Sequence, residues 1–184
     1  MKSYAITDPS FYSNKKEFQY YIKSILDQNV DYICFRDKTN NFYEEYAILF
    51  LSYKTSFLKT NFFLHNHYNI ALKLNADGVH INKTLLKNIN MDSSKILIIL
   101  STHNKEDIQM AIDKNYYAVT YSPIFLTPNK GIPVGINGLN KMVQESKIKI
   151  IALGGIVTNY HLNLLKNSNI YAFASIRFFS DLKI

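Results

Sequence analysis

The feature that most constrains the fold is an alternation between short, continuously apolar runs and longer segments with helical spacing. The apolar runs are four to six residues long and rich in β-branched and aromatic residues; they cover residues 4–7, 32–35, 62–65, 78–81, 96–100, 117–121, 148–153 and 170–174. A strand that is apolar throughout is covered on both faces, which is typical of a parallel sheet.

Between these runs, apolar residues recur at the spacing of an amphipathic helix, as Phe18, Ile22 and Ile25 do. Asn104 followed by two acidic residues indicates a helix start. We count six or seven such segments, the last cut short at Ile184. Eight strand–helix steps predict a single domain over residues 1–184 with the (β/α)₈ TIM-barrel fold, small, with abbreviated helices and a truncated last helix. An open doubly wound sheet is the alternative, although no Gly-rich turn follows the first strand.

Composition narrows the class of protein. Hydrophobic residues make up 47% and charged residues 19% of the 184 residues, as in a globular domain. The single cysteine, Cys34, excludes a disulfide framework. The chain opens MKSYAITD, without a basic and then apolar leader, and holds no membrane-length apolar run, so we expect a cytoplasmic protein without a membrane partner. The net charge is +7, but the lysines are scattered without a run of five, which argues against a nucleic-acid partner.

Polar and cationic residues follow almost every predicted strand. In chain order these segments are Arg36-Asp37-Lys38, His65-Asn66-His67, His80, Ser101-Thr102-His103, the segment 122–131 with Thr127 and Lys130, Gly154-Gly155, and Ser175-Ile176-Arg177. In a (β/α)₈ barrel the carboxyl ends of the strands meet at one open face. Since Arg and Lys side chains bind phosphate oxygens, the sequence predicts an anion site in the barrel mouth.

Two residue types leave alternatives open. Gly154-Gly155 follows the seventh strand, where a phosphate cup commonly forms, although a tight turn without a ligand would use the same residues. The four histidines near the strand ends could be buried core residues or metal ligands. Because no metal-binding spacing is present, we expect no metal ligands among them.

These motifs together resemble the thiamine phosphate synthase family, which includes the TenI-type thiazole tautomerases. The resemblance runs through nearly the whole chain and is most specific at Phe35-Arg36-Asp37-Lys38, Asp77-Gly78-Val79-His80, Ser101-Thr102-His103, Ser122-Pro123-Ile124-Phe125 and Gly154-Gly155-Ile156. It implies a small barrel enzyme acting late in thiamine biosynthesis, with thiazole phosphate and, for the synthase reaction, hydroxymethylpyrimidine diphosphate as ligands.

The resemblance also implies roles for individual residues. Ser101 would lie near the leaving pyrophosphate, and Ser175 would lie in the phosphate site. The diphosphate would be held by Arg36, Lys38, Asn66 and Lys130, and the thiazole phosphate by Thr127, Gly154 and Gly155.

Departures from the family pattern bear on the choice between the synthase and the tautomerase reaction. Synthases place a Mg²⁺-binding Asp where this chain has His67, and residues 81–86 lack the second carboxylate, so Mg²⁺ is expected only if synthase activity is retained. This favours TenI-like tautomerisation, with His65 or His67 as the acid–base group, although the tautomerase histidine is replaced by Pro123. A catalytically weak or inactive thiazole-phosphate-binding or regulatory homologue is the alternative. The sequence leaves the oligomeric state open, a homodimer included.

Overall fold

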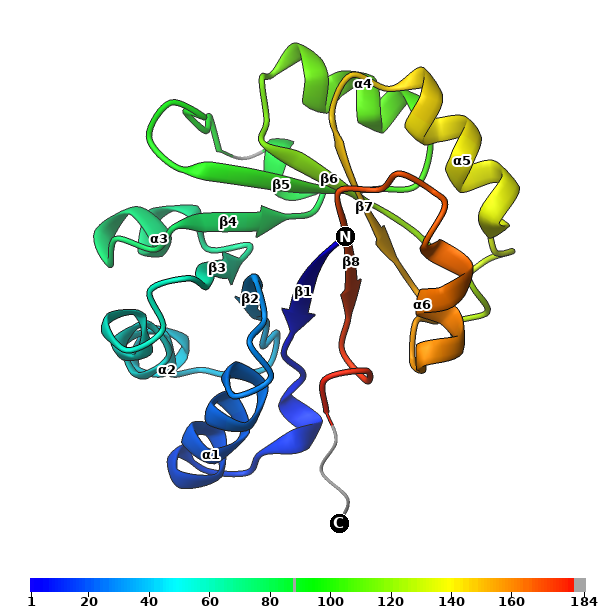
Figure 1. Cartoon of the computed structure of the whole chain (residues 1–184). Coiled ribbons are helices and arrows are strands. Elements are labelled where there is room, and N and C mark those ends of the chain that lie inside the picture. The colour runs from blue at the N-terminus through cyan, green and yellow to red at the C-terminus, as the bar shows by residue number, and fades with distance from the viewer. Residues whose placement is uncertain (88, 181–184) are drawn as a thin grey trace.

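Eight parallel strands close into a barrel in a computed structural model of the chain, which describes residues 1–87 and 89–180. Each strand pairs with the next along the chain, and the first pairs with the last (Figure 1). The strands are β1 (Lys2–Ile6), β2 (Tyr32–Phe35), β3 (Asn61–His65), β4 (Gly78–Ile81), β5 (Leu97–Thr102), β6 (Ala118–Tyr121), β7 (Lys149–Leu153) and β8 (Ala172–Ser175). The closed barrel confirms the predicted fold, and every strand lies within two residues of its predicted bounds.

Six α-helices surround the strands in the described part of the chain (Figure 1). They are α1 (Lys15–Leu26), α2 (Tyr43–Leu51), α3 (Tyr68–Lys73), α4 (Lys105–Asp113), α5 (Gly135–Glu145) and α6 (Asn159–Leu165). Short 3₁₀ helices lie at Pro9–Phe11, Ser52–Thr55 and Leu85–Lys87, and the last of these takes the place of an α-helix between β4 and β5. Residues 176–180 form a turn after β8, and the predicted truncated last helix falls on residues 181–184, outside the described residues.

The strand residues alternate between two apolar cores, which explains the continuous apolar runs. Phe62 and Leu64 of β3 face the helices, whereas Phe63 fills the barrel interior beside Tyr4. Gly78 on β4 makes room for this ring, because a Cβ there would lie 2.0 Å from Phe63 Cε1. Burial on both faces is what a parallel sheet covered by helices requires.

Three tyrosines close the amino-terminal end of the barrel. The hydroxyl groups of Tyr32, Tyr117 and Tyr171 hydrogen-bond to one another, with 2.9 Å between Tyr32 and Tyr117 and 2.6 Å between Tyr117 and Tyr171. Lys149 Nζ lies 3.7 Å from the centre of the Tyr117 ring, a cation–π contact. This end is therefore filled by side chains, and the open cavity lies at the other end.

No helix among the described residues is both long enough and apolar enough to cross a membrane.

Candidate functional site

A cavity of about 390 Å³ opens at the carboxyl ends of the strands, within the size range of small-molecule sites. It is lined by nine of the residues singled out from the sequence: Arg36, Lys38, His65, Ser101, Thr127, Lys130, Gly154, Gly155 and Ser175. His67 and Asn66 are not among its lining residues. The cavity is also lined by His80, Asn82, His103, Ser122 and Arg177. The sequence groups Arg177 with the cations of the predicted anion site and leaves the two histidines open as core residues or metal ligands.

Strand alternation explains how several of these side chains reach the cavity. In β3 and β4, Phe63 and Gly78 lie on the interior face, so His65 and His80 two residues later face inward as well. The same parity carries Ser101 inward two residues after Ile99. These side chains occupy the carboxyl-terminal layer of the barrel interior, directly beneath the loops.

A buried chain of hydrogen bonds supports Ser101. His80 Nε2 lies 3.0 Å from Ser101 Oγ, and His80 Nδ1 lies 3.1 Å from the Tyr4 hydroxyl. Burial, and then nearby Arg36, lower the pKa of His80 to about 3, so the ring is neutral at neutral pH. In the tautomer in which Tyr4 donates to Nδ1, the ring donates from Nε2 to Ser101, and the Ser101 hydrogen is then free for a ligand. Tyr4 and His80 are separated by 76 positions in the sequence, and they meet only through the register of the barrel.

His65 is a poor proton acceptor despite its place in the cavity. Burial, followed by electrostatic interactions with His80 and Arg36, lowers the pKa of His65 to about 2. The side chain is 8% exposed and stays neutral through the physiological range. The expected acid–base role of His65 therefore gains no support from its surroundings.

The structure places His67 away from the cavity. Its ring stacks on Tyr43 with 3.7 Å between ring centres, at the start of α3. The preceding Asn66 has a positive φ of 60°, and its Oδ1 accepts a hydrogen bond from the Asn82 backbone N–H at 2.9 Å. This turn ends the strand alternation, so His67 does not line the cavity with His65, and Asn66 joins two loops.

His103 presents the most accessible imidazole. Its Nδ1 lies 2.8 Å from the Ser122 carbonyl oxygen, which can only accept. Nδ1 must therefore carry the hydrogen of the neutral ring, which leaves a lone pair on Nε2. The serine–threonine–histidine motif on β5 contained this signal, although only the fold identifies the partner.

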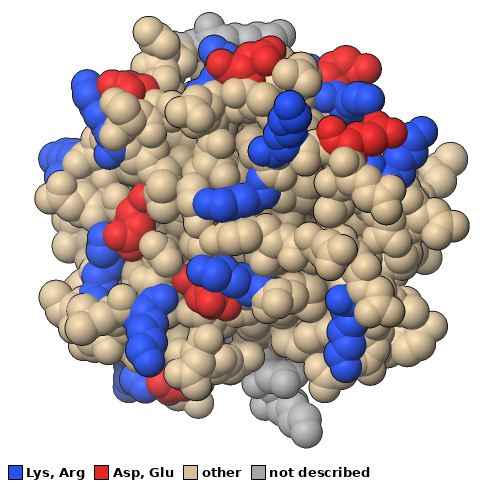
Figure 2. All heavy atoms as spheres, turned by 45° about the horizontal axis from the view of Figure 1, so that its top comes forward, with Lys and Arg blue, Asp and Glu red and all other residues tan. Residues whose placement is uncertain are grey.

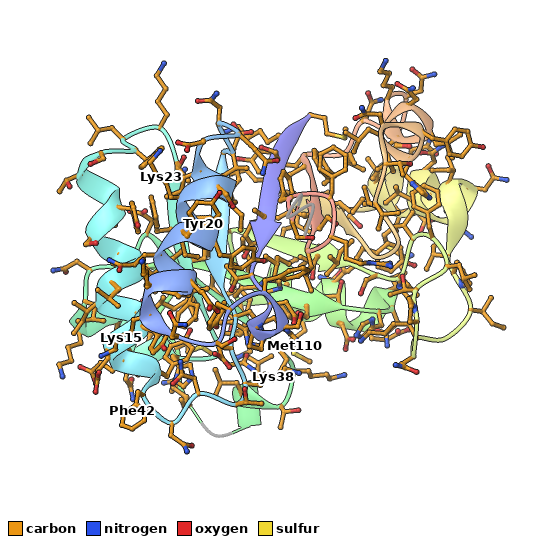
Figure 3. The ribbon with its side chains drawn as sticks, turned by 90° about the horizontal axis from the view of Figure 1, so that it is seen from below. Lys15, Tyr20, Lys23, Lys38, Phe42 and Met110 are labelled. Carbon is orange, nitrogen blue, oxygen red and sulfur yellow. The ribbon has the colours of Figure 1, made fainter. Side chains whose placement is uncertain are left out.

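Two cations of the cavity lining, Arg36 and Lys38, lie in the loop after β2. Arg36 is held by Asp8, with Nη1 3.2 Å from Oδ2. Lys38 follows in the same loop, whose start is fixed by Asp37: its Oδ1 accepts hydrogen bonds from the Thr39 and Asn40 backbone N–H groups at 2.9 and 3.1 Å. Figure 3 shows Lys38 at the end of the molecule toward which β1 runs, opposite Lys23 near the end of α1.

The loop after β7 approaches the β6–α5 loop closely. Gly154 and Gly155 have φ values of +102° and +71°. A Cβ on Gly155 would lie 2.7 Å from the Leu126 carbonyl oxygen. Ser175 Oγ donates to the Ile156 carbonyl at 2.6 Å and accepts from the Phe178 N–H at 3.1 Å, so it fastens β8 to this loop. The glycines permit both the left-handed backbone and the loop contact.

The lining residues do not fit Mg²⁺. This ion favours oxygen ligands and is usually bound through carboxylates, but no Asp or Glu of residues 1–87 and 89–180 lines the cavity. Nor do three His, Cys, Asp or Glu side chains within these residues converge on a point where a metal ion could be held. The cavity chemistry suits anions.

Lysines and arginines elsewhere on the visible surface form no continuous band. Figure 2 shows them spread over this face, several beside Asp or Glu. Among the described residues, Lys15 pairs with Glu45 at 2.6 Å and Lys73 with Glu44 at 2.5 Å. This distribution differs from the concentrated basic surface typical of nucleic-acid-binding proteins.

Comparison with known proteins gives consistent matches. The family model described as thiamine monophosphate synthase matches residues 3–178. A thiamine-phosphate synthase from Lawsonia intracellularis is 29% identical, over 83% of this chain and 73% of that protein. A putative thiamine-phosphate synthase 2 from Aquifex aeolicus is 27% identical over 97% of both chains.

Solved structures share the fold. A thiamine phosphate pyrophosphorylase from Pyrococcus furiosus superposes with a TM-score of 0.78 at 22% identity, covering 95% of this chain and 85% of that one. A geranylgeranylglyceryl phosphate synthase from Thermoplasma acidophilum gives 0.67 at 12% identity, covering 98% and 86%.

Proposed function

Because the chain belongs to the thiamine monophosphate synthase family, we propose that it couples a thiazole phosphate to hydroxymethylpyrimidine diphosphate, giving thiamine phosphate and pyrophosphate. The observation that carries the proposal is the convergence of Arg36, Lys38 and Lys130 on one cavity with Ser101. In this reaction the pyrimidine methylene C–O bond breaks and its electron pair leaves with pyrophosphate. The thiazole nitrogen lone pair then forms the new C–N bond.

The cavity groups match the demands of that step. Charge accumulates on the departing pyrophosphate, and fixed cations with a hydroxyl donor stabilise it. Ser101, supported by His80, supplies the donor without a change in its own protonation. The backbone of Gly154 and Gly155 forms the candidate cup for the thiazole phosphate. No step requires a histidine base, in keeping with the low pKa values of His65 and His80.

A direct assay tests the proposal. Purified protein is incubated with both substrates, with Mg²⁺ or with a chelator, and thiamine phosphate is measured by chromatography. We expect product, and at least a tenfold lower rate for Ser101→Ala, since one transition-state hydrogen bond is commonly worth that much or more. Thr84→Ala is the matched control, because it removes an exposed hydroxyl group that does not line the cavity. Absence of product under both conditions would contradict the proposal.

One observation favours a second candidate, tautomerisation of a thiazole carboxylate phosphate. His103 has its Nδ1 hydrogen held by the Ser122 carbonyl and its Nε2 lone pair free, as a proton-transfer group requires. His103→Asn keeps an N–H donor but loses the base. If the wild-type chain isomerises thiazole carboxylate phosphate and this variant does not, the tautomerase reaction is supported. Binding of thiazole phosphate without either conversion would identify a non-catalytic homologue.

A further inference from the structure

A fourth cation lines the cavity beside the glycine loop. Arg177 lies in the turn after β8, and the residues around it are fixed. Phe178 donates its backbone N–H to Ser175 Oγ, and Phe179 stacks on Phe173 with 5.6 Å between ring centres. The Phe179 carbonyl accepts a hydrogen bond from Gln28 Nε2 at 3.0 Å. The turn is therefore anchored to β8 and to Gln28 after α1, and Arg177 lines the cavity.

The charges on this cavity are one-sided. Arg36, Lys38, Lys130 and Arg177 line it, and no carboxylate within the described ranges does so. Of the four, only Arg36 forms an ion pair with a described carboxylate, that of Asp8. A divalent cation placed here would face these four cations without an acidic ligand, whereas a phosphorylated ligand would meet charge of the opposite sign.

We propose that Arg177 is a further anion-binding residue of this cavity and that the four cations together hold the diphosphate group without a divalent metal ion. This deepens the proposed function, because it concerns the same cavity and substrate. Arg177 adds a planar, permanently charged donor group to the three cations Arg36, Lys38 and Lys130. The four side chains supply the charge compensation that a metal ion would otherwise give.

Binding of inorganic pyrophosphate tests the proposal independently of turnover. Calorimetric titrations are run in a chelator and again in excess Mg²⁺ on the wild-type chain. We expect binding in the chelator, and equal or weaker binding with Mg²⁺, because complexation lowers the negative charge of pyrophosphate. Binding that requires Mg²⁺, or no binding under either condition, would overturn the proposal.

Variants then test Arg177 itself. Arg177→Gln should weaken pyrophosphate binding by about tenfold or more, because a charge-assisted hydrogen bond is lost, and Arg177→Lys should weaken it less. Lys166→Gln, which removes one exposed charge just after α6 and outside the cavity lining, should change the affinity by less than about twofold, as expected for a distant screened charge. Equal affinities for Arg177→Gln and Lys166→Gln, with both variants folded by circular dichroism, would contradict a role for Arg177.

The outcomes separate this proposal from the proposed function. Coupling activity that depends on Mg²⁺ would overturn the metal-free binding and leave the coupling reaction supported. Metal-free pyrophosphate binding that weakens in Arg177→Gln, in a protein that forms no thiamine phosphate, would support the cation site and overturn the coupling reaction.

Discussion

Replacing Gly155 with alanine tests the close contact between the loop after β7 and the β6–α5 loop. The backbone at Gly155 has a φ of +71°, a conformation that costs a non-glycine residue about 1–2 kcal/mol. The added Cβ would also lie 2.7 Å from both Leu126 O and Phe125 Cβ, so the β6–α5 loop must shift. Overpacking of this kind costs a further 1–3 kcal/mol or so. We therefore expect Gly155→Ala to lower the free energy of unfolding by about 2–5 kcal/mol in total.

Two other glycines separate these contributions. Gly135 has a φ of +70° but no atom within 4 Å of an added Cβ, so Gly135→Ala should cost only the backbone strain of about 1–2 kcal/mol. Gly131 has neither a positive φ nor a close neighbour, so Gly131→Ala should be neutral or stabilising by up to about 1 kcal/mol.

Urea unfolding followed by circular dichroism measures all three variants. For a chain of this size, each 1 kcal/mol corresponds to roughly 2–4 °C in Tm, so thermal scans give a second reading. Pyrophosphate affinity should fall in Gly155→Ala, because the displaced loop carries Thr127 and Lys130. A Gly155→Ala protein as stable as Gly135→Ala would refute the close loop contact.

Three further predictions concern the barrel interior. Folded His65 and His80 have pKa values lowered to about 2 and 3 from 6.5, so the unfolded chain binds more protons below pH 6.5 and stability should fall as the pH drops from 6.5 toward 3. Each histidine changes the free energy of unfolding by up to about 1.4 kcal/mol per pH unit. Urea unfolding at several pH values should therefore show a weaker dependence of stability on pH for His80→Gln than for the wild type. An unchanged pH dependence would exclude a contribution from His80. Tyr117→Phe should lower stability by about 1–2 kcal/mol, since it breaks the tyrosine hydroxyl cluster, whereas the exposed Tyr20→Phe should not; equal unfolding midpoints would contradict the cluster's contribution. Gly78→Ala should lower the free energy of unfolding by about 2 kcal/mol or more, because the added Cβ collides with the Phe63 ring. Adding Phe63→Leu should restore part of this loss. Purely additive effects of the two substitutions in a double-mutant cycle would refute the contact.

The strands were predictable because burial on both faces leaves a direct mark on sequence. Runs such as residues 96–100 are apolar on both faces, and the number of these runs predicts closure of the sheet. The candidate site was predictable as far as strand parity extends. His65 and Ser101 face the cavity because they continue the alternation of β3 and β5.

Other features depend on contacts that a linear pattern does not contain. His67 leaves the site because Asn66 turns the chain at a positive φ, and nothing in the spacing of the two histidines fixes that turn. The support of Ser101 by His80 and Tyr4 depends on barrel register, since these residues lie on three different strands. The place of Arg177 depends on how Phe178 and Phe179 pack against β8.

A crystal structure with pyrophosphate and thiazole phosphate bound, grown in a chelator, would show which residues hold each phosphate group. We predict pyrophosphate in contact with Arg36, Lys38, Lys130 and Arg177, with Ser101 donating to it, and the thiazole phosphate against the Gly154–Gly155 backbone. Phosphate groups bound elsewhere on the molecule, with this cavity empty, would contradict it.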